Sequence, residues 1–193
     1  MIQNEQKEKI CQEAYRYWMA NIKGIGNVTK KKICAACGGA RELYQMSYHQ
    51  LDSMTFLTFR QKEMILQGKK DWNLTNQYQN FLKERISFVT IEEADYPWLL
   101  RQIHDVPYAL YYLGELPKEK EEITAMVGAR KCSAYGKTYA YEIAKELGKH
   151  QQSVVSGLAY GIDGESHKGC LDGGGRTYAF LGCGVDICYP KEH

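Results

Sequence analysis

The sequence predicts an α/β protein in two parts, a small all-helical domain followed by a domain built on a parallel β-sheet. All four prolines lie at or after Pro97 and most glycines lie after Gly114, so the first part has few residues that break helices. Beyond residue 122, short apolar runs alternate with longer helix-forming segments, which is typical of parallel strands joined by helices. We therefore place the domains at residues 1–86 and 87–193.

The first domain consists of successive predicted helices. Apolar residues in each segment recur close to the spacing of a helix, and hydroxyl side chains that can cap a first turn start three of them. Gly38 and Gly39 are expected to end the second helix, and Gly68 the fourth. In order, with the capping residue in parentheses, the predicted helices cover residues 6–21, 29–37 (Thr29), 47–54 (Ser47), 58–68 (Thr58) and 74–85.

The second domain starts with two predicted strands, 88–90 and 110–113, which flank a short helix that begins at Tyr96-Pro97. The parallel sheet follows in the order strand, helix, strand, helix, strand. Because parallel strands joined by crossovers run in the same direction, their carboxyl ends should open on one edge. The predicted segments are 123–127, 135–149, 153–156, 162–172 and 177–181.

Each of the three sheet strands ends in a turn that contains glycine. Ligands of open α/β sheets bind beyond the carboxyl ends of the strands. Glycine lets a backbone approach closely, and bare amides beside a helix N-terminus bind anions, while a guanidinium and a hydroxyl add donors that suit phosphate. One such turn is also typical of an ordinary strand-to-helix connection. Three turns together favour a phosphate site made of Gly128, Arg130, Ser156, Gly157, Gly161, Gly182 and Gly184.

Three polar residues of the segment 162–172 have alternative interpretations. Asp163 and His167 are four residues apart and share one helix face. They could act as acid and base. We favour a supporting role, in which Asp163 caps the helix and His167 hydrogen-bonds back toward it, because no nucleophile is placed nearby. Lys168 could contact a phosphate or be solvated.

Neither a metal site nor a dinucleotide site is expected. Cys34 and Cys37 form a single pair without a further Cys or His at zinc spacing, and they fit a helix core. The segment Gly182-Cys183-Gly184 lacks the third glycine of the dinucleotide fingerprint, since Ile187 stands in its place. We therefore expect no cofactor and no metal.

The composition is ordinary for a globular protein, with 44% hydrophobic and 25% charged residues. No apolar run reaches the roughly 18 residues of a membrane span, and the polar N-terminus has no signal-peptide core. Seven cysteines, an odd number, favour reduced thiols and a cytoplasmic location without a membrane partner. Residues 1–85 hold 14 Lys/Arg against 8 Asp/Glu, a balance that permits phosphate contact.

Residues 22–27, Ile-Lys-Gly-Ile-Gly-Asn, join two predicted helices and resemble the turn of a helix-hairpin-helix. The glycines permit a tight turn, and the amides of the following helix can face a DNA phosphate. A plain helical hairpin with a solvated lysine cluster explains the same residues. The possible secondary DNA contacts are Lys23, Gly24, Gly26 and Lys30.

The combined motifs of the second domain resemble the DNA-processing protein A (DprA/Smf) family. The resemblance rests on Val127-Gly128-Ala129-Arg130, the run 156–171, the Gly-Cys-Gly that follows the last sheet strand, and Tyr189-Pro190. It spans about residues 88–190. The departures are small: Ala129 stands where a small hydroxyl residue is frequent, and Cys170 where alanine is usual.

This resemblance implies a Rossmann-like domain, preceded by a helical SAM-like domain, that binds single-stranded DNA without catalysis. It further implies protection of incoming DNA in natural transformation, loading of the RecA recombinase and a possible homodimer. In the family the Gly-x-Arg turn and the neighbouring glycine loops hold the sugar–phosphate backbone, which points to Gly128 and Arg130, then to Ser156 and Gly157. The family's domain continues past the Tyr-Pro segment, so the sheet is expected to be truncated at its C-terminal side.

Two other functions would use the same edge of the sheet. The first is a nucleotide-binding enzyme of Rossmann-like fold, similar to a phosphoribohydrolase, with Asp163 or His167 as acid or base. Turnover of a common nucleotide that His167→Ala abolishes would favour it. The second is a dinucleotide-binding oxidoreductase, against which the incomplete glycine fingerprint counts.

Overall fold

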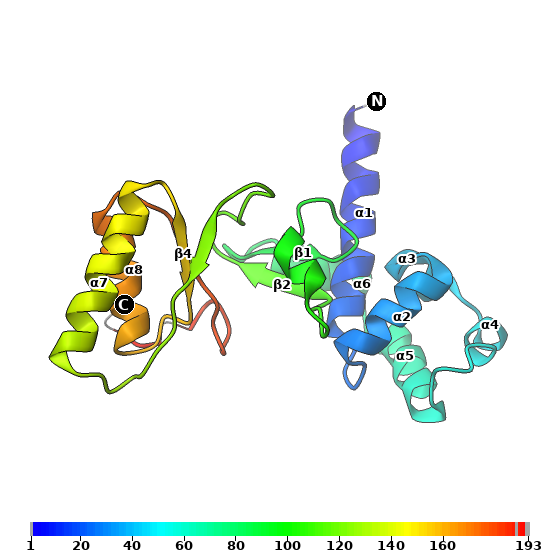
Figure 1. Cartoon of the computed structure of the whole chain (residues 1–193). Helices are drawn as coiled ribbons and strands as arrows, with labels where there is room; N and C mark the ends of the chain where they lie inside the picture. The colour runs from blue at the N-terminus through cyan, green and yellow to red at the C-terminus, as the bar shows by residue number, and fades with distance from the viewer. Residues whose placement is uncertain (1, 188, 192–193) are drawn as a thin grey trace. The chain divides into compact units, whose positions relative to one another are not determined.

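A computed structural model describes residues 2–187 and 189–191, with side chains from residue 12 onward. The chain forms two compact units, Met1–Gly114 and Glu115–His193. The first unit contains helices and an antiparallel strand pair, and the second contains a parallel sheet with its helices (Figure 1). This arrangement confirms the predicted fold class of a parallel α/β sheet preceded by a helical part. None of the helices in the described range is long and apolar enough to cross a lipid bilayer.

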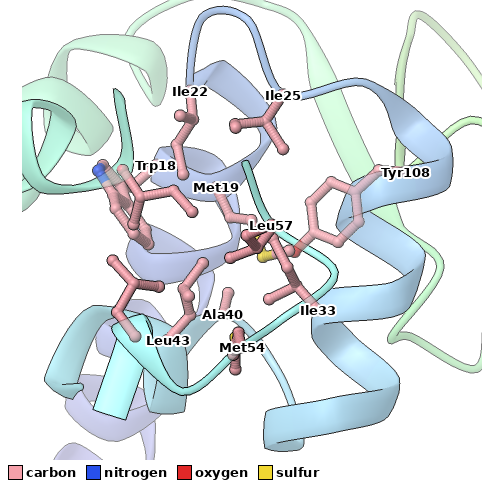
Figure 2. Packing of buried hydrophobic residues seen from close by; sticks show 12 residues of the cluster. Trp18, Met19, Ile22, Ile25, Ile33, Ala40, Leu43, Met54, Leu57 and Tyr108 are labelled. Atoms are coloured by element: carbon pink, nitrogen blue, oxygen red, sulfur yellow. The ribbon is translucent and has the colours of Figure 1, made fainter. Parts of the chain in front are cut away.

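The helical part of the first unit is held together by one main cluster of buried side chains. Trp18, Met19, Ile33 and Leu43 are each at most 1% exposed, and Figure 2 shows them packed together, the first two from one helix and the others from two more. Burial of such apolar side chains is the main stabilising term of a fold. The helices are α1 (Ile2–Asn21), α2 (Asn27–Cys37), α3 (Ala40–Gln45), α4 (Tyr48–Asp52), α5 (Phe59–Asp71) and α6 (Leu74–Phe81).

The caps of these helices test the local predictions. Ser47 and Thr58 are confirmed as N-caps, and each forms a reciprocal capping box with the Gln three residues on. Thr29 is wrong as a cap, because the hairpin turn is so tight that α2 already begins at Asn27, after Gly26. Gly68 does not end α5. It lies inside the helix, where its carbonyl accepts the indole N–H of Trp18 at 3.1 Å.

The short helix α3 was not predicted, and α6 ends at Phe81 rather than near residue 85. Residue Gly38 is confirmed as the end of α2, with the left-handed conformation that suits a C-cap. The six residues of α3 follow directly from Gly39, and two of them, Ala40 and Leu43, are buried in the main cluster. Tertiary packing, rather than the periodicity of so short a segment, therefore accounts for α3.

An antiparallel strand pair follows the helices. It consists of β1 (Ser87–Thr90) and β2 (Ala109–Tyr112), with a 3₁₀ helix, η1 (Trp98–Gln102), between them. Tyr108, just before β2, is 1% exposed and inserts into the helical core (Figure 2), where its hydroxyl donates to Glu92. Phe88 and Tyr111 stack against each other with ring centroids 5.9 Å apart, and both rings also contact Tyr17 of α1.

These contacts explain where the first compact unit ends. The strand pair belongs to the same unit as the helices, so that unit extends to Gly114, beyond the domain boundary that we predicted at residue 86. The predicted boundary was set by a change of composition and of periodicity, and neither signal reports which unit a hairpin packs on. The domain limits 1–86 and 87–193 stay a prediction.

The second unit is a three-stranded parallel sheet in the order β3-β4-β5, with β4 in the centre. Helices α7 and α8 pack on each other and both contact β4, and Figure 1 shows them on one side of that strand. The strands β3 and β5 end two residues earlier than predicted, at Ala125 and Ala179, although the amides of Met126 and Phe180 still donate to carbonyls of β4. The elements are β3 (Ile123–Ala125), α7 (Ala134–Lys149), β4 (Ser153–Ser156), α8 (Ile162–Asp172) and β5 (Thr177–Ala179).

Candidate anion-binding rim at the strand ends

Three turns follow the carboxyl ends of β3, β4 and β5, and we call residues 126–133, 157–161 and 180–187 together the rim. Strand register places the turns next to one another, since Ala125 pairs with Val155 and Ser156 pairs with Ala179. Backbone hydrogen bonds continue this contact into the turns. The Phe180 amide donates to the Ser156 carbonyl at 2.9 Å, and the Ile162 amide to the Ala129 carbonyl at 3.3 Å. The rim is therefore one continuous surface, as the parallel topology predicts.

A buried carboxylate fastens two of these turns together. Asp163, in the first turn of α8, is 7% exposed. Its Oδ1 accepts the amide of Gly128 at 3.3 Å and its Oδ2 accepts the amide of Gly157 at 3.2 Å. We predicted that Asp163 caps its own helix, and this is wrong. The N-cap residue is Gly161, which has no side chain that could accept a hydrogen bond from the first turn. The two glycine amides are directed at this internal anion, so they are not open donors for a phosphate.

Glycine at positions 128 and 161 allows the turns to approach this closely. A Cβ on Gly128 would lie 2.6 Å from the side chain of Ile162. A Cβ on Gly161 would lie 2.3 Å from the carbonyl oxygen of Ala129, and Gly161 also has a φ of +82°, which side chains disfavour. Both glycines thus have an architectural role in joining the turn after β3 to the turn before α8.

Ser156 is engaged in the same architecture. It is 4% exposed, and its hydroxyl donates to the carbonyl of Met126 at 2.6 Å, across from β4 to the end of β3. Because the hydroxyl has one proton, this bond leaves no donor for a phosphate. The structure therefore places Ser156 under the rim rather than on it.

His167 and Asp163 do not form the pair that the sequence suggested. His167 is 5% exposed, and its Nδ1 contacts the hydroxyl of Thr177 on β5 rather than Asp163, so the predicted hydrogen bond toward Asp163 is wrong. A general acid or base must reach the substrate. Both side chains are buried, so the geometry does not support the acid–base role of the nucleotide-enzyme hypothesis. Lys168 is exposed and lies 6.0 Å from the ring centroid of Tyr141 on α7.

The open donors of the rim lie just beyond Gly128. The amides of Ala129, Arg130 and Lys131 have no hydrogen-bond partner among the residues that the structure describes. The side chains of Arg130 and Lys131 are exposed, and neither forms an ion pair within the described range. Consecutive bare amides combined with a guanidinium and an ammonium are a donor set for phosphate oxygens. We call residues 129–131 the cationic turn.

Lys131 and the amides of the cationic turn were missed by the motif-based prediction, which took Gly128 as the backbone donor. The charge pattern could have found them. From residue 123 to residue 141 the chain has no Asp or Glu, while it has Arg130, Lys131 and Lys137. Such a stretch of one sign raises the local concentration of anions.

The third turn of the rim suits an anion less well. Gly182 and Gly184 are both exposed. A Cβ on Gly184 would lie 2.4 Å from the carboxylate oxygen of Asp186, so a negative charge accompanies that glycine. Among the described residues, no group of three or more His, Cys, Asp or Glu side chains could hold a metal ion.

The helical hairpin departs from the prediction at Lys30. This side chain is 6% exposed, and its Nζ donates to the Ala20 carbonyl at the end of α1, at 2.5 Å. It also lies 5.7 Å from the ring centroid of Tyr108. Burial lowers the pKa of Lys30 to about 8. The Lys30 ammonium therefore hydrogen-bonds a carbonyl at the C-terminus of α1, and its burial does not favour the predicted DNA contact, which stays untested.

The remaining hairpin residues are placed as a tight turn requires. Gly24 has a φ of +75° and lies against Met64 of α5, while Gly26 is the extended N-cap of α2. Lys23 is exposed, as are Lys31 and Lys32. A secondary DNA contact by Lys23, Gly24 and Gly26 stays a prediction.

The parallel sheet defines an α/β protein of the Rossmann-like class, and the exposed cations Arg130 and Lys131 lie at one edge of that sheet. The family model of DNA recombination-mediator protein A matches residues 87–193, more than half of the chain. The chain belongs to this family, known as DprA/Smf, which confirms the resemblance identified from its motifs.

Named relatives agree with this assignment. Protein Smf of Synechocystis is 30% identical over 183 residues, which are 92% of this chain and 46% of that protein. The DNA processing protein DprA of Streptococcus pneumoniae is 38% identical over 123 residues, which are 64% of this chain and 42% of that protein. The chain thus spans about half the length of the curated relatives it matches.

A solved structure agrees in fold. The X-ray structure of DNA processing protein A from Streptococcus pneumoniae superposes with a TM-score of 0.72 and 24% identity, covering 93% of this chain and 61% of that one. Because the similarity extends over nearly the whole of this chain, the helical unit and the sheet unit both have counterparts in that structure.

Proposed function

We propose that this protein binds single-stranded DNA through the sugar–phosphate backbone, and that the cationic turn is the main contact. The observation that carries the proposal is the open row of amides at Ala129, Arg130 and Lys131, next to two exposed cations in a segment free of acidic residues. Contacts of this kind recognise phosphate without reading bases, so binding should be independent of sequence.

Membership of a recombination-mediator family supports a role in DNA processing. We infer that the protein acts in the cytoplasm, protects DNA that enters during natural transformation, and helps to load the RecA recombinase as a homodimer. In this role the protein is a binding protein rather than an enzyme and needs neither a metal nor a cofactor. Gly182, Gly184 and Lys168 are secondary candidates for phosphate contact.

Single-stranded DNA binding can be tested with an end-labelled oligothymidylate by fluorescence anisotropy at several salt concentrations. The wild-type protein should lose affinity steeply as salt rises, because phosphate contacts release counterions. Arg130→Ala should weaken binding about tenfold or more, since a hydrogen bond to a charged group is worth roughly 1.5–3 kcal/mol. It should also make the slope of log K against log salt shallower by about 0.7.

Arg60→Ala is the matched control, because Arg60 is an exposed arginine of α5 and its loss removes the same charge. It should leave both the affinity and the salt slope close to wild type. The proposal fails if binding is absent or independent of salt, or if Arg60→Ala weakens it as much as Arg130→Ala does. A loss for oligothymidylate alone, and not for mixed sequences, would also contradict a backbone contact.

A further inference from the structure

Two neighbouring tyrosines lie exposed on the first two turns of α7, close in the chain to the cationic turn. Tyr135 is 69% exposed and Tyr139 is 52% exposed. Their ring centroids are 4.3 Å apart, with an angle of 38° between the ring planes. Four residues separate them, so they lie on the same face of the helix. The opposite face of α7 carries Ala140 and Ala144, which are buried in the second unit.

Leaving two large aromatic rings exposed to water is energetically unfavourable. Each large aromatic side chain left in water forgoes roughly 1.5–3 kcal/mol of burial energy, and the pair is not covered by any other described part of its unit. Paired exposed rings are typical of a surface that contacts another molecule. The pair therefore marks a contact surface whose partner has to be identified from its chemical surroundings.

On the N-terminal side of the pair the sequence is cationic, while Glu142, three residues after Tyr139, is an exposed acidic neighbour on the C-terminal side. Arg130 and Lys131 precede Tyr135, Lys137 lies between the two tyrosines, and the nearest acidic residues along the chain are Glu122 and Glu142. All three cations are exposed. A partner that brings flat apolar groups together with a regular row of negative charges fits this combination. Single-stranded nucleic acid has both, since its bases are unpaired and its backbone carries one charge per nucleotide.

We propose that Tyr135 and Tyr139 form a stacking platform for the bases of the DNA strand whose phosphates bind the cationic turn. This inference rests on the proposed function and extends it by naming the residues that take the bases. A duplex would not fit the platform in the same way, because its bases already stack on one another. The platform thus gives a preference for single strands, which phosphate contacts alone do not give.

The same helix supplies a control for the alternative occupant, an apolar surface of another protein or of a second copy. Ile143, one turn beyond Tyr139, is 53% exposed and continues the stripe. An apolar protein surface would bury Ile143 together with the tyrosines. A stack of bases depends on the aromatic faces and leaves Ile143 with little effect.

The test compares three variants, Tyr135→Leu/Tyr139→Leu, Tyr135→Phe/Tyr139→Phe and Ile143→Ala. Leucine keeps apolar bulk without an aromatic face, and phenylalanine keeps the face without the hydroxyl. Two probes of equal length are used, an oligothymidylate and its abasic analogue with the same sugar–phosphate backbone. Thermal melting should show all variants folded, because the three positions are exposed.

Stacking of one base on an aromatic ring corresponds to about a 5- to 150-fold change in affinity. We expect the leucine variant to bind oligothymidylate at least about fivefold more weakly, and the phenylalanine variant and Ile143→Ala to bind like wild type. Wild type should prefer oligothymidylate to the abasic probe by a similar factor, and the leucine variant should lose that preference.

The outcomes distinguish failure of the stacking platform from failure of the proposed single-stranded DNA binding. If wild type binds oligothymidylate with a steep salt dependence but the leucine variant binds equally well, the platform is refuted and the proposed function stands. If the leucine variant matches the phenylalanine variant, or Ile143→Ala lowers affinity as much, the surface is merely apolar and the platform is refuted as well. If wild type does not bind single strands at all, both proposals fall.

Discussion

Replacing Gly161 by alanine tests whether the rim is assembled by close approach of its turns. Gly161 has φ +82° and ψ −126°, a conformation that is open to glycine and costly for other residues. The new Cβ would also lie 2.3 Å from the carbonyl oxygen of Ala129 and 2.6 Å from that of Arg130. Both oxygens belong to backbone, so the turn after β3 has to move away.

Gly174→Ala is a control for a positive φ without a close contact. Gly174 has almost the same φ, +83°, but a Cβ there would meet nothing within 4 Å. It should cost only the conformational penalty of about 1–2 kcal/mol. In Gly161→Ala the displacement adds the loss of the bond from the Ile162 amide to the Ala129 carbonyl, about 1 kcal/mol, and overlap of the turns. We expect a total loss of roughly 2–4 kcal/mol in the stability of the second unit.

The assay has to report the second unit alone. All three tryptophans, Trp18, Trp72 and Trp98, lie in the unit Met1–Gly114, so tryptophan fluorescence follows the first unit and serves as the internal control. Amide hydrogen exchange of peptides from β4 and α8, measured by mass spectrometry, gives the free energy of opening of the second unit.

Gly161→Ala should lower this opening free energy by at least 1 kcal/mol more than Gly174→Ala does. It should also weaken DNA binding more, because the displaced backbone carries the amides of the cationic turn. Equal losses for the two variants would show that only φ matters, and that the turns are not held by contact at Gly161.

Two further predictions concern buried charged side chains. Asp163→Asn should lower the stability of the second unit by about 1.5–3 kcal/mol, since an amide N–H₂ would face one of the two glycine amides. The control is Asp186→Asn at an exposed position, which should change the free energy of unfolding, measured by urea denaturation, by less than about 0.5 kcal/mol. Unfolding should take up a proton at Lys30 in the pH range between its folded pKa of about 8 and its ordinary pKa of 10.5. Wild type should therefore gain stability over Lys30→Met as pH rises, by up to about 1.4 kcal/mol per pH unit, and a flat difference would contradict this.

Much of the fold could be predicted because its signals are local. The caps at Ser47 and Thr58 depend on residues only three positions away in the sequence. The strand β4 and the helix α8 were predicted with their observed bounds because each is an apolar or helix-forming segment with turn residues at its ends. The helix α3 depends instead on packing of Ala40 and Leu43 in the main cluster, and the limit of the first unit depends on the hairpin that inserts Tyr108 into that cluster. No local pattern around residue 108 reports that contact.

The candidate site shows the same division between local and long-range information. The sequence indicates where the turns are, but the partners of their polar groups come from far along the chain. Asp163 lies 35 residues from Gly128, and Lys30 meets the ring of Tyr108, which follows it by 78 residues. Both side chains were predicted at the surface or at a helix end, because burial of a charge is decided by the elements that pack over it.

The glycine signature of the rim therefore has a different meaning from the one its composition suggests. Gly128 and Gly157 offer their amides to Asp163, so the protein supplies its own anion at the point where a phosphate was expected. A second anion there would be repelled by the carboxylate and would find no open donor. The same two bonds fix the path of the backbone that leaves Gly128, and that backbone carries the open amides and the two cations of the cationic turn. Gly128 and Gly157 thus fix the position of the backbone, and the phosphate contact that we propose lies at residues 129–131, which follow Gly128.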